Sequence, residues 1–268
     1  MRVCVAGMGK SGTTALVYAI RAAMPADTVL LFEPRTFVPV TAPNVAAKVL
    51  LHTKHPMPYP FYRQFERLVL IVRDPRDVLV SRLLYRAYGA TSMLADPARL
   101  ERYLALLRAK EADPRSVSLL EINDVFETMG GSSAHTDEGR ARMLADAIAF
   151  HAAFPDALVF KYETMVAGDF APLADHLSLD AEAMNPTVPA ALRRVDRTRR
   201  AGNWRDWFRP EDVAHYRPLL ADYMRRYGYD DDWAIAAEPC IRPEECSEYV
   251  LRLVRERQGT LRPAATGD

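Results

Sequence analysis

The chain has 268 residues, of which 49% are hydrophobic, so it is long enough to bury a sizeable core within one generous domain. Lysine plus arginine number 35 and aspartate plus glutamate also number 35, which gives a formal net charge of zero. This balance excludes a bulk polyanion binder, and we expect neither a nucleic-acid nor a membrane partner.

The cysteines argue against a disulfide framework and against a zinc site, because there are three of them and their spacing fits neither. Cys4 lies in an apolar run, whereas Cys240 and Cys246 flank a proline-containing turn and could pair. No stretch approaches about 18 consecutive apolar residues, and no apolar run of signal-peptide length stands near residue 1. We therefore expect a soluble, cytoplasmic protein without a bound metal.

Residues 3–14, VCVAGMGKSGTT, hold the strongest local signal. Residues 3–6 predict a short buried strand and residues 15–23 predict a helix. A strand, a glycine-rich turn and a helix together present backbone N–H groups and a positive helix end to an anion. The turn adds a mobile charge and hydroxyl donors, so we expect it to bind a phosphate or sulfate ester through Gly9, Lys10, Ser11, Gly12, Thr13 and Thr14.

This turn only partly fits the nucleoside triphosphatase loop, G-x-x-x-x-G-K-[ST]. Gly9, Lys10 and Ser11 match the end of that pattern, but the first glycine would have to be residue 4, which is Cys4. The incomplete motif therefore gives only partial support to the alternative of an ATP- and Mg²⁺-dependent kinase.

Two further strands are predicted to end in candidate proton acceptors. Residues 28–32 run into Glu33-Pro34, and Pro34 favours an extended or turn conformation at Glu33. Residues 46–55 are apolar in the middle and end with His52, Lys54 and His55. In open α/β sheets, ligands bind beyond the carboxyl ends of the strands, so both segments belong near the glycine-rich turn.

A fourth predicted strand, residues 68–72, is fully apolar and is followed by the sequence RDPRD. Asp74 is a good N-cap and Pro75 a good first residue for the helix that follows. Arg73 at the strand end and Ser81 within that helix could bind one anion, the first through a forked guanidinium and the second through a hydroxyl.

The second half of the chain adds one strand and several helices. Residues 157–160 predict the strand and precede KYE at 161–163, while helices are expected at 100–110, 140–154, 170–177, 210–226 and 243–257. Residues 113–123 and 130–137 have the composition of loops. Within 197–207, RTRRAGNWRDW, four arginines flank Gly202 and two tryptophans can anchor the segment.

These elements predict an α/β fold: a single domain at 1–258 with a central parallel sheet flanked by helices and an anion-binding loop after the first strand. Residues 89–139 are interpreted as a substrate-side insertion or lid, and residues 259–268 as a flexible tail.

Four segments, taken in order, resemble sulfotransferases that use 3′-phosphoadenosine 5′-phosphosulfate (PAPS). KSGTT at 10–14 is similar to the 5′-phosphosulfate loop, IVRDPRDVLVS at 71–81 to the 3′-phosphate motif, FKYE at 160–163 to a strand end near the adenine, and 197–204 to the loop that closes over the 3′-phosphate. The resemblance covers residues 3–208, except for 89–150.

The sequence also departs from the family pattern. Many cytosolic members carry tryptophan after the two threonines to stack on adenine, and this chain has Ala15. In the loop that closes over the 3′-phosphate, called the late loop below, those members carry Arg-Lys-Gly, whereas this chain has RTR at 197–199.

The general base differs between branches of the family. Members that act on small molecules use a histidine base in Lys-Thr-His, of which HTKH at 52–55 is a scrambled version. Carbohydrate and protein-tyrosine members use a glutamate after the second strand, which Glu33 matches; Glu33 is favoured over His55, and the choice stays open.

The resemblance implies a PAPS-dependent sulfotransferase that transfers a sulfuryl group to a hydroxyl or amine of a small-molecule or carbohydrate acceptor and releases 3′-phosphoadenosine 5′-phosphate (PAP), without a metal. It assigns catalysis to Lys10 with Glu33 or His55. It assigns cofactor binding to residues 9–14, Arg73, Ser81, Tyr162, Arg197, Arg199, Arg200 and Gly202. A small-molecule kinase and a non-catalytic PAP-binding module remain the alternatives.

Overall fold

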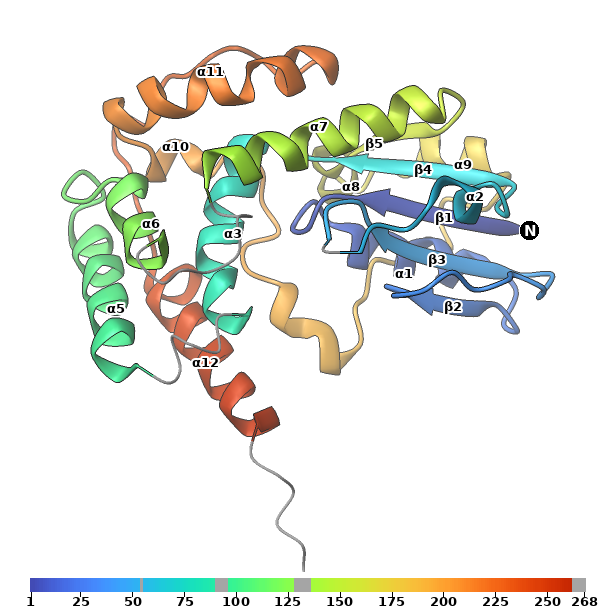
Figure 1. Cartoon of the computed structure of the whole chain (residues 1–268), viewed down its shortest axis with the longest axis horizontal. Helices are drawn as coiled ribbons and strands as arrows, with labels where there is room; N and C mark the ends of the chain where they lie inside the picture. Colours follow the sequence, from blue (N-terminus) through green and yellow to red (C-terminus); the bar gives the residue numbers. More distant parts are fainter. Residues whose placement is uncertain (54, 90–95, 128–135, 262–268) are drawn as a thin grey trace, which may run out of the picture. The chain divides into compact units, whose positions relative to one another are not determined.

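The computed structural model describes residues 1–53, 55–89, 96–127 and 136–261 (Figure 1). The chain divides into two compact units. The sheet unit consists of Met1–Asp74, Arg140–Arg193 and Tyr223–Tyr229, and the helical unit consists of Pro75–Gly139, Arg194–Asp222 and Asp230–Asp268.

The sheet unit contains five parallel strands in the order β2-β3-β1-β4-β5 (Figure 1). In this register Val5 of β1 faces Lys48 of β3 on one side and Val69 of β4 on the other. The predicted central parallel sheet is therefore confirmed. The strands are β1 (Arg2–Gly7), β2 (Val29–Phe32), β3 (Val45–Leu50), β4 (Arg67–Val72) and β5 (Leu158–Lys161).

The strand order reverses direction beside β1. The three inner strands are almost wholly buried, as expected for parallel strands covered on both faces. From β1 the chain moves to β2 and β3 on one side, whereas β4 and β5 lie on the other side. Open α/β sheets bind ligands at such a reversal, outside the carboxyl ends of the strands. Residues 8–12 follow β1 at this edge, and residues 73–74 follow β4.

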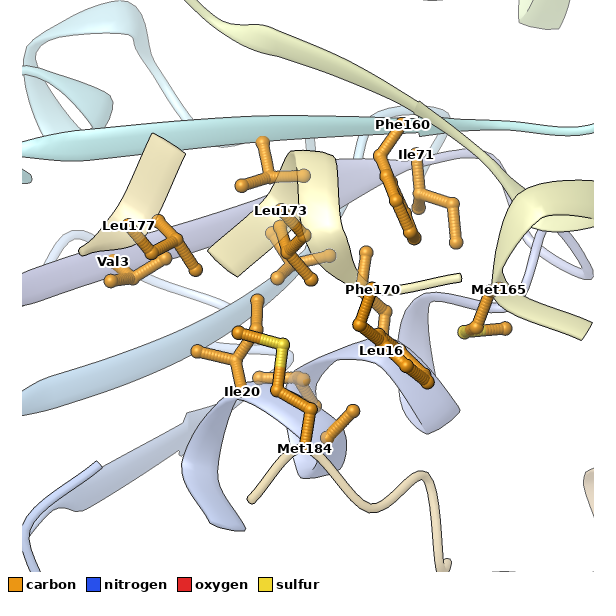
Figure 2. Close-up of a cluster of buried hydrophobic side chains, with 14 of the residues drawn as sticks. Val3, Leu16, Ile20, Ile71, Phe160, Met165, Phe170, Leu173, Leu177 and Met184 are labelled. Carbon is orange, nitrogen blue, oxygen red and sulfur yellow. The ribbon is translucent and has the colours of Figure 1, made fainter. Parts of the chain in front are cut away.

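Helices of the sheet unit pack their apolar faces against the sheet. Figure 2 shows Leu16 and Ile20 of α1 (Thr13–Ala23) gathered with Val3 of β1 and Leu173 of α9 (Ala171–Leu177). These four side chains are at most 1% exposed. Burial of this kind is worth about 1.5–3 kcal/mol for each large aliphatic side chain. The sheet unit also contains α2 (Tyr59–Tyr62), α8 (Tyr162–Val166) and most of α7 (Asp137–Ala153).

The helical unit has its own apolar core. In it α12 lies along α3 (Figure 1), and the largest buried side chains include Trp204, Tyr103, Phe126 and Tyr249. Its elements are α3 (Pro75–Gly89), α5 (Pro97–Ala112), α6 (Leu119–Glu127), α10 (Trp204–Trp207), most of α11 (Pro210–Arg226), the 3₁₀ turn η3 (Pro243–Glu245) and α12 (Ser247–Leu261). The 3₁₀ turn η2 (Ala190–Val195) spans the boundary between the units.

One expected loop, residues 113–123, is helical only in its second part: residues 113–118 are non-helical, and α6 begins at Leu119. A capping box was the local signal: Ser118 and Glu121 bond reciprocally, at 2.8 Å from the Ser118 N–H and 3.1 Å from the Glu121 N–H. The other reason is not visible locally, because the buried carboxylate of Asp212 accepts from the N–H groups of Leu119 and Leu120. A distant residue therefore completes the helix end.

The remaining boundary predictions stay predictions. The domain limits at 1–258 are not tested, and the suggested lid at 89–139 includes residues 90–95 and 128–135, which lie outside the described residues. Most of the loop expected at 130–137 and most of the tail at 259–268 lie outside them as well. The described part of the insertion forms α5 and α6.

All three cysteines are free thiols, so Cys240 and Cys246 do not pair. Cys4 is buried in the sheet unit and Cys246 in the helical unit, and burial raises the pKa of both thiols. Cys240 is exposed. Across the described part of the chain, every helix is too short or too polar to cross a membrane.

Candidate phosphosulfate site

The loop after β1 leads to an open helix end. The N-cap of α1 is Gly12, with φ 94°, and no side chain caps this end. The first turn contains no acidic residue. The early N–H groups of a helix lack intrahelical partners and carry its positive end, so this terminus suits an anion. Thr13 and Thr14 are the first two residues of the helix.

Two glycines of this region have no room for a side chain. A Cβ at Gly7 would lie 2.8 Å from the Ile71 carbonyl oxygen. A Cβ at Gly12 would lie 2.6 Å from the Tyr162 ring, and the positive φ there is already unfavourable for other residues. The glycines therefore let the loop pass close against β4 and α8.

Ser11 shapes the loop from within. Its hydroxyl donates to the Met8 carbonyl oxygen at 2.7 Å, and its N–H donates to the same oxygen at 3.2 Å. The residue is fully buried. Of the predicted anion donors, Ser11 is thus engaged inside the loop, whereas Thr13 and Thr14 lie in the first turn of α1.

Arg73 is joined directly to the same loop. Its guanidinium donates to the Lys10 carbonyl oxygen at 3.1 Å and lies 4.1 Å from the centre of the Tyr162 ring. Lys10 has a left-handed backbone, with φ 74°. Tyr162, which the family resemblance places near the adenine, here lies beneath Arg73 and against Gly12. It therefore supports both the arginine and the loop.

Glu163 fixes the turn that follows Arg73. Its carboxylate accepts from the Asp74 N–H at 2.9 Å and from the Tyr229 hydroxyl at 3.1 Å. Burial raises the pKa of Glu163 above its ordinary value. The KYE segment is therefore a support for the end of β4, which the sequence alone did not indicate.

Lys48 is a residue of the site that the sequence interpretation missed. It is buried in β3, where its ammonium donates to the Thr14 hydroxyl oxygen at 2.8 Å and pairs with the Glu33 carboxylate at 2.5 Å. The signal that could have found it is a lone lysine in an apolar strand, because buried lysines are almost always paired. Since Lys48 occupies an oxygen lone pair of Thr14, the hydroxyl hydrogen remains available to donate to an anion.

The candidate bases differ in their surroundings. Glu33 has a left-handed backbone, with φ 49°, and its carboxylate is the one bound by Lys48. His55 is exposed, and among the described residues it makes no hydrogen bond or ion pair. His52 pairs with Asp146, with 2.9 Å between Nδ1 and Oδ2.

In the helical unit, the second half of the RDPRD motif holds the late loop. The fully buried carboxylate of Asp77 accepts from the N–H groups of Gly202 and Trp204, at 2.7 and 3.0 Å. The Arg76 guanidinium lies 4.1 Å from the Trp204 ring centre and 5.0 Å from that of Trp233. Trp204 and Trp207, the two tryptophans expected to anchor this segment, are both buried.

Apart from Arg73, the predicted residues of the 3′-phosphate site lie in the helical unit. Ser81 is buried on α3, and Gly202 has φ 76°. The arginines of the loop meet acidic or carbonyl oxygens: Arg200 pairs with the Glu245 carboxylate, Arg199 with Asp196 at 2.6 Å, and Arg197 donates to the Glu245 carbonyl oxygen at 3.4 Å. The sheet unit contains residues 9–14, Glu33, His55, Arg73 and Tyr162.

No protein-family model matches the chain, and no curated protein matches it. Among solved structures, mouse sulfotransferase SULT7A1 complexed with PAP is similar, with a TM-score of 0.53 and 16% sequence identity over 85% of this chain and 84% of that chain. The two chains share a fold. At this identity the likeness establishes the α/β architecture, with its central parallel sheet, and leaves the chemistry to the site itself.

Within the ranges that the structure describes, no group of three or more histidine, cysteine, aspartate or glutamate side chains is arranged to hold a metal ion.

Proposed function

We propose that this protein transfers the sulfuryl group of PAPS to a hydroxyl or amine of a small-molecule or carbohydrate acceptor and releases PAP. The observation that carries the proposal is the open N-terminus of α1 beside Lys10, with Arg73 bound to the Lys10 carbonyl oxygen. The open helix N-terminus and the lysine suit a 5′-phosphosulfate. The guanidinium of Arg73 suits a 3′-phosphate.

Both phosphates of PAPS have candidate ligands among the residues described. The N–H groups and hydroxyls of Thr13 and Thr14 would hold the 5′-phosphate, helped by the Lys48 contact that orients the Thr14 hydroxyl. Arg73 of the sheet unit would bind the 3′-phosphate through its guanidinium, and the resemblance also assigns Ser81 and residues 197–202 of the helical unit to this phosphate. PAPS supplies an activated sulfuryl group, so these residues need only to position it and to stabilise charge on the leaving phosphate.

Lys10 would carry the largest share of that stabilisation. Its ammonium can neutralise the negative charge that develops on the oxygen between sulfur and phosphorus as that bond breaks. A general base must also take the proton of the acceptor, a role worth about 10²–10⁴-fold in rate when well placed. Glu33 and His55 are the bases that the sequence suggests.

Thermal unfolding with and without nucleotide is the decisive first experiment. We expect PAP to stabilise the protein by about 2.7 kcal/mol at a concentration of one hundred times its dissociation constant, and ATP with Mg²⁺ to have no comparable effect. The reverse result would favour the kinase alternative. Stabilisation by PAP without transfer to any acceptor would favour a binding module.

Replacing Arg73 tests the 3′-phosphate assignment. We expect Arg73→Ala to weaken PAP by about 1.5–3 kcal/mol, the value of a hydrogen bond to a charged group, and to leave the affinity for AMP nearly unchanged because AMP lacks the 3′-phosphate. Calorimetry with both nucleotides measures the difference. Arg67→Ala is a matched control, since Arg67 is an exposed arginine at the start of β4, the strand that Arg73 follows. Equal losses for PAP and AMP would remove Arg73 from the 3′-phosphate site.

A further inference from the structure

A histidine–aspartate pair lies in the sheet unit, apart from the residues assigned above. His52 follows β3, and Asp146 lies on α7, far away in the sequence. The His52 Nδ1 is 2.9 Å from the Asp146 Oδ2, and the side chains are 14% and 41% exposed. The histidine is therefore well enclosed, while its partner keeps contact with solvent.

The contact between His52 and Asp146 selects the tautomer of the imidazole ring. An ionised carboxylate can only accept hydrogen bonds, so the His52 Nδ1 must donate to Asp146. In the neutral ring the lone pair then resides on Nε2. This is the arrangement in which a carboxylate orients a histidine so that it can act as a base.

The pair also lies at the ligand-binding edge of the sheet. The N–H of Leu51, the residue just before His52, donates to the carbonyl oxygen of Gly7 at 3.1 Å. Gly7 is the last residue of β1, and the phosphosulfate loop begins directly after it. His52 therefore leaves β3 beside the start of that loop.

The other two candidates are less well arranged for proton transfer. The Glu33 carboxylate forms an ion pair with the Lys48 ammonium, which also donates to the Thr14 hydroxyl oxygen of α1. Glu33 therefore helps to hold Lys48 against the start of α1. His55 is exposed, and within the described residues it has no carboxylate to orient it. His52 alone among the three combines enclosure, an orienting carboxylate and a position beside the loop.

We propose that His52, positioned by Asp146, is the general base of the sulfuryl transfer; this inference rests on the function proposed above. The acceptor oxygen attacks sulfur and forms a new S–O bond. The bond from sulfur to the bridging oxygen of PAPS breaks, and its electron pair stays on the phosphate of PAP. The acceptor proton moves to the His52 Nε2, and the imidazolium later releases it to water.

Steady-state kinetics tests the base directly, with para-nitrophenol and glucosamine as acceptors and PAP release as the readout. We expect His52→Ala to lower kcat about 10²–10⁴-fold with little change in KM for PAPS, and added imidazole to restore part of the rate. Asp146→Asn should lower kcat in the same way, and Asp146→Glu should recover part of it.

Two controls match these variants. His215 forms another pair with an aspartate, Asp137, at 2.9 Å in the helical unit, so His215→Ala removes a similar contact. Asp156→Asn changes an exposed carboxylate just after α7. Both controls should keep the wild-type rate. PAP binding by each variant, measured by calorimetry, shows that the sheet unit is folded.

Nitrogen NMR of the histidine rings gives a readout that is independent of activity. We expect the neutral His52 ring to carry its hydrogen on Nδ1 in the wild type and to lose this preference in Asp146→Asn. A hydrogen on Nε2 in the wild type would overturn the inference. So would unchanged kcat in His52→Ala while the wild type transfers sulfuryl groups. If the wild type neither binds PAP nor transfers from PAPS, the proposed function and this inference both fail.

Discussion

Lys10→Ala is expected to reduce kcat at least about 10²–10³-fold while PAP still binds. Loss of one preorganised group that stabilises transition-state charge typically costs this much. PAP lacks the sulfuryl group, and its 5′-phosphate would still meet the N–H groups at the start of α1. The effect should therefore be concentrated in turnover, measured as PAP release, with the affinity for PAP measured by calorimetry.

Two companion variants sharpen this test. Arg21→Ala removes an exposed positive charge from the last turn of α1 and should leave turnover unchanged. Lys10→Arg keeps a positive charge at residue 10 but changes its shape, so it should retain more activity than Lys10→Ala. Wild-type turnover in Lys10→Ala would refute the proposed role of this lysine.

Asp77→Ala is expected to lower the free energy of unfolding by about 2–5 kcal/mol, since it leaves two N–H groups of the late loop without their buried acceptor. The 197–204 segment would also lose its anchor on α3. We therefore expect PAP to bind more weakly as well. Chemical denaturation measures the first effect and calorimetry the second.

Glu101→Ala is the matched control for Asp77→Ala. Glu101 is also a carboxylate of the helical unit, but it is 67% exposed and paired with Arg108 at the surface. Exposed ion pairs contribute about 0–1 kcal/mol, so this variant should unfold nearly like the wild type. If the two variants lose the same free energy of unfolding, Asp77 does not anchor the late loop.

The parts of the fold that were predicted correctly depend on short-range patterns. Apolar runs of strand length predicted the five strands, and the glycine-rich turn predicted the open start of α1. Pro75 correctly marked the first residue of α3. Such signals lie within a few residues of each other, so a single sequence carries them in full.

The parts that were missed depend on contacts between distant residues. Lys48 meets Glu33 and Thr14 only because β2 and β3 are neighbours in the sheet. The pair formed by His52 and Asp146 likewise needs α7 to pack near the end of β3. No local pattern encodes either arrangement, which is why residue type at a strand end left the general base undecided.

The three free thiols provide natural reporters of local opening. Cys4 can react with a thiol reagent only when the sheet unit opens, and Cys246 only when the helical unit opens, while Cys240 reacts from the surface. Labelling kinetics would therefore give separate opening free energies for the two units without any introduced probe. A nucleotide that slowed labelling of one buried thiol more than the other would reveal which unit it stabilises.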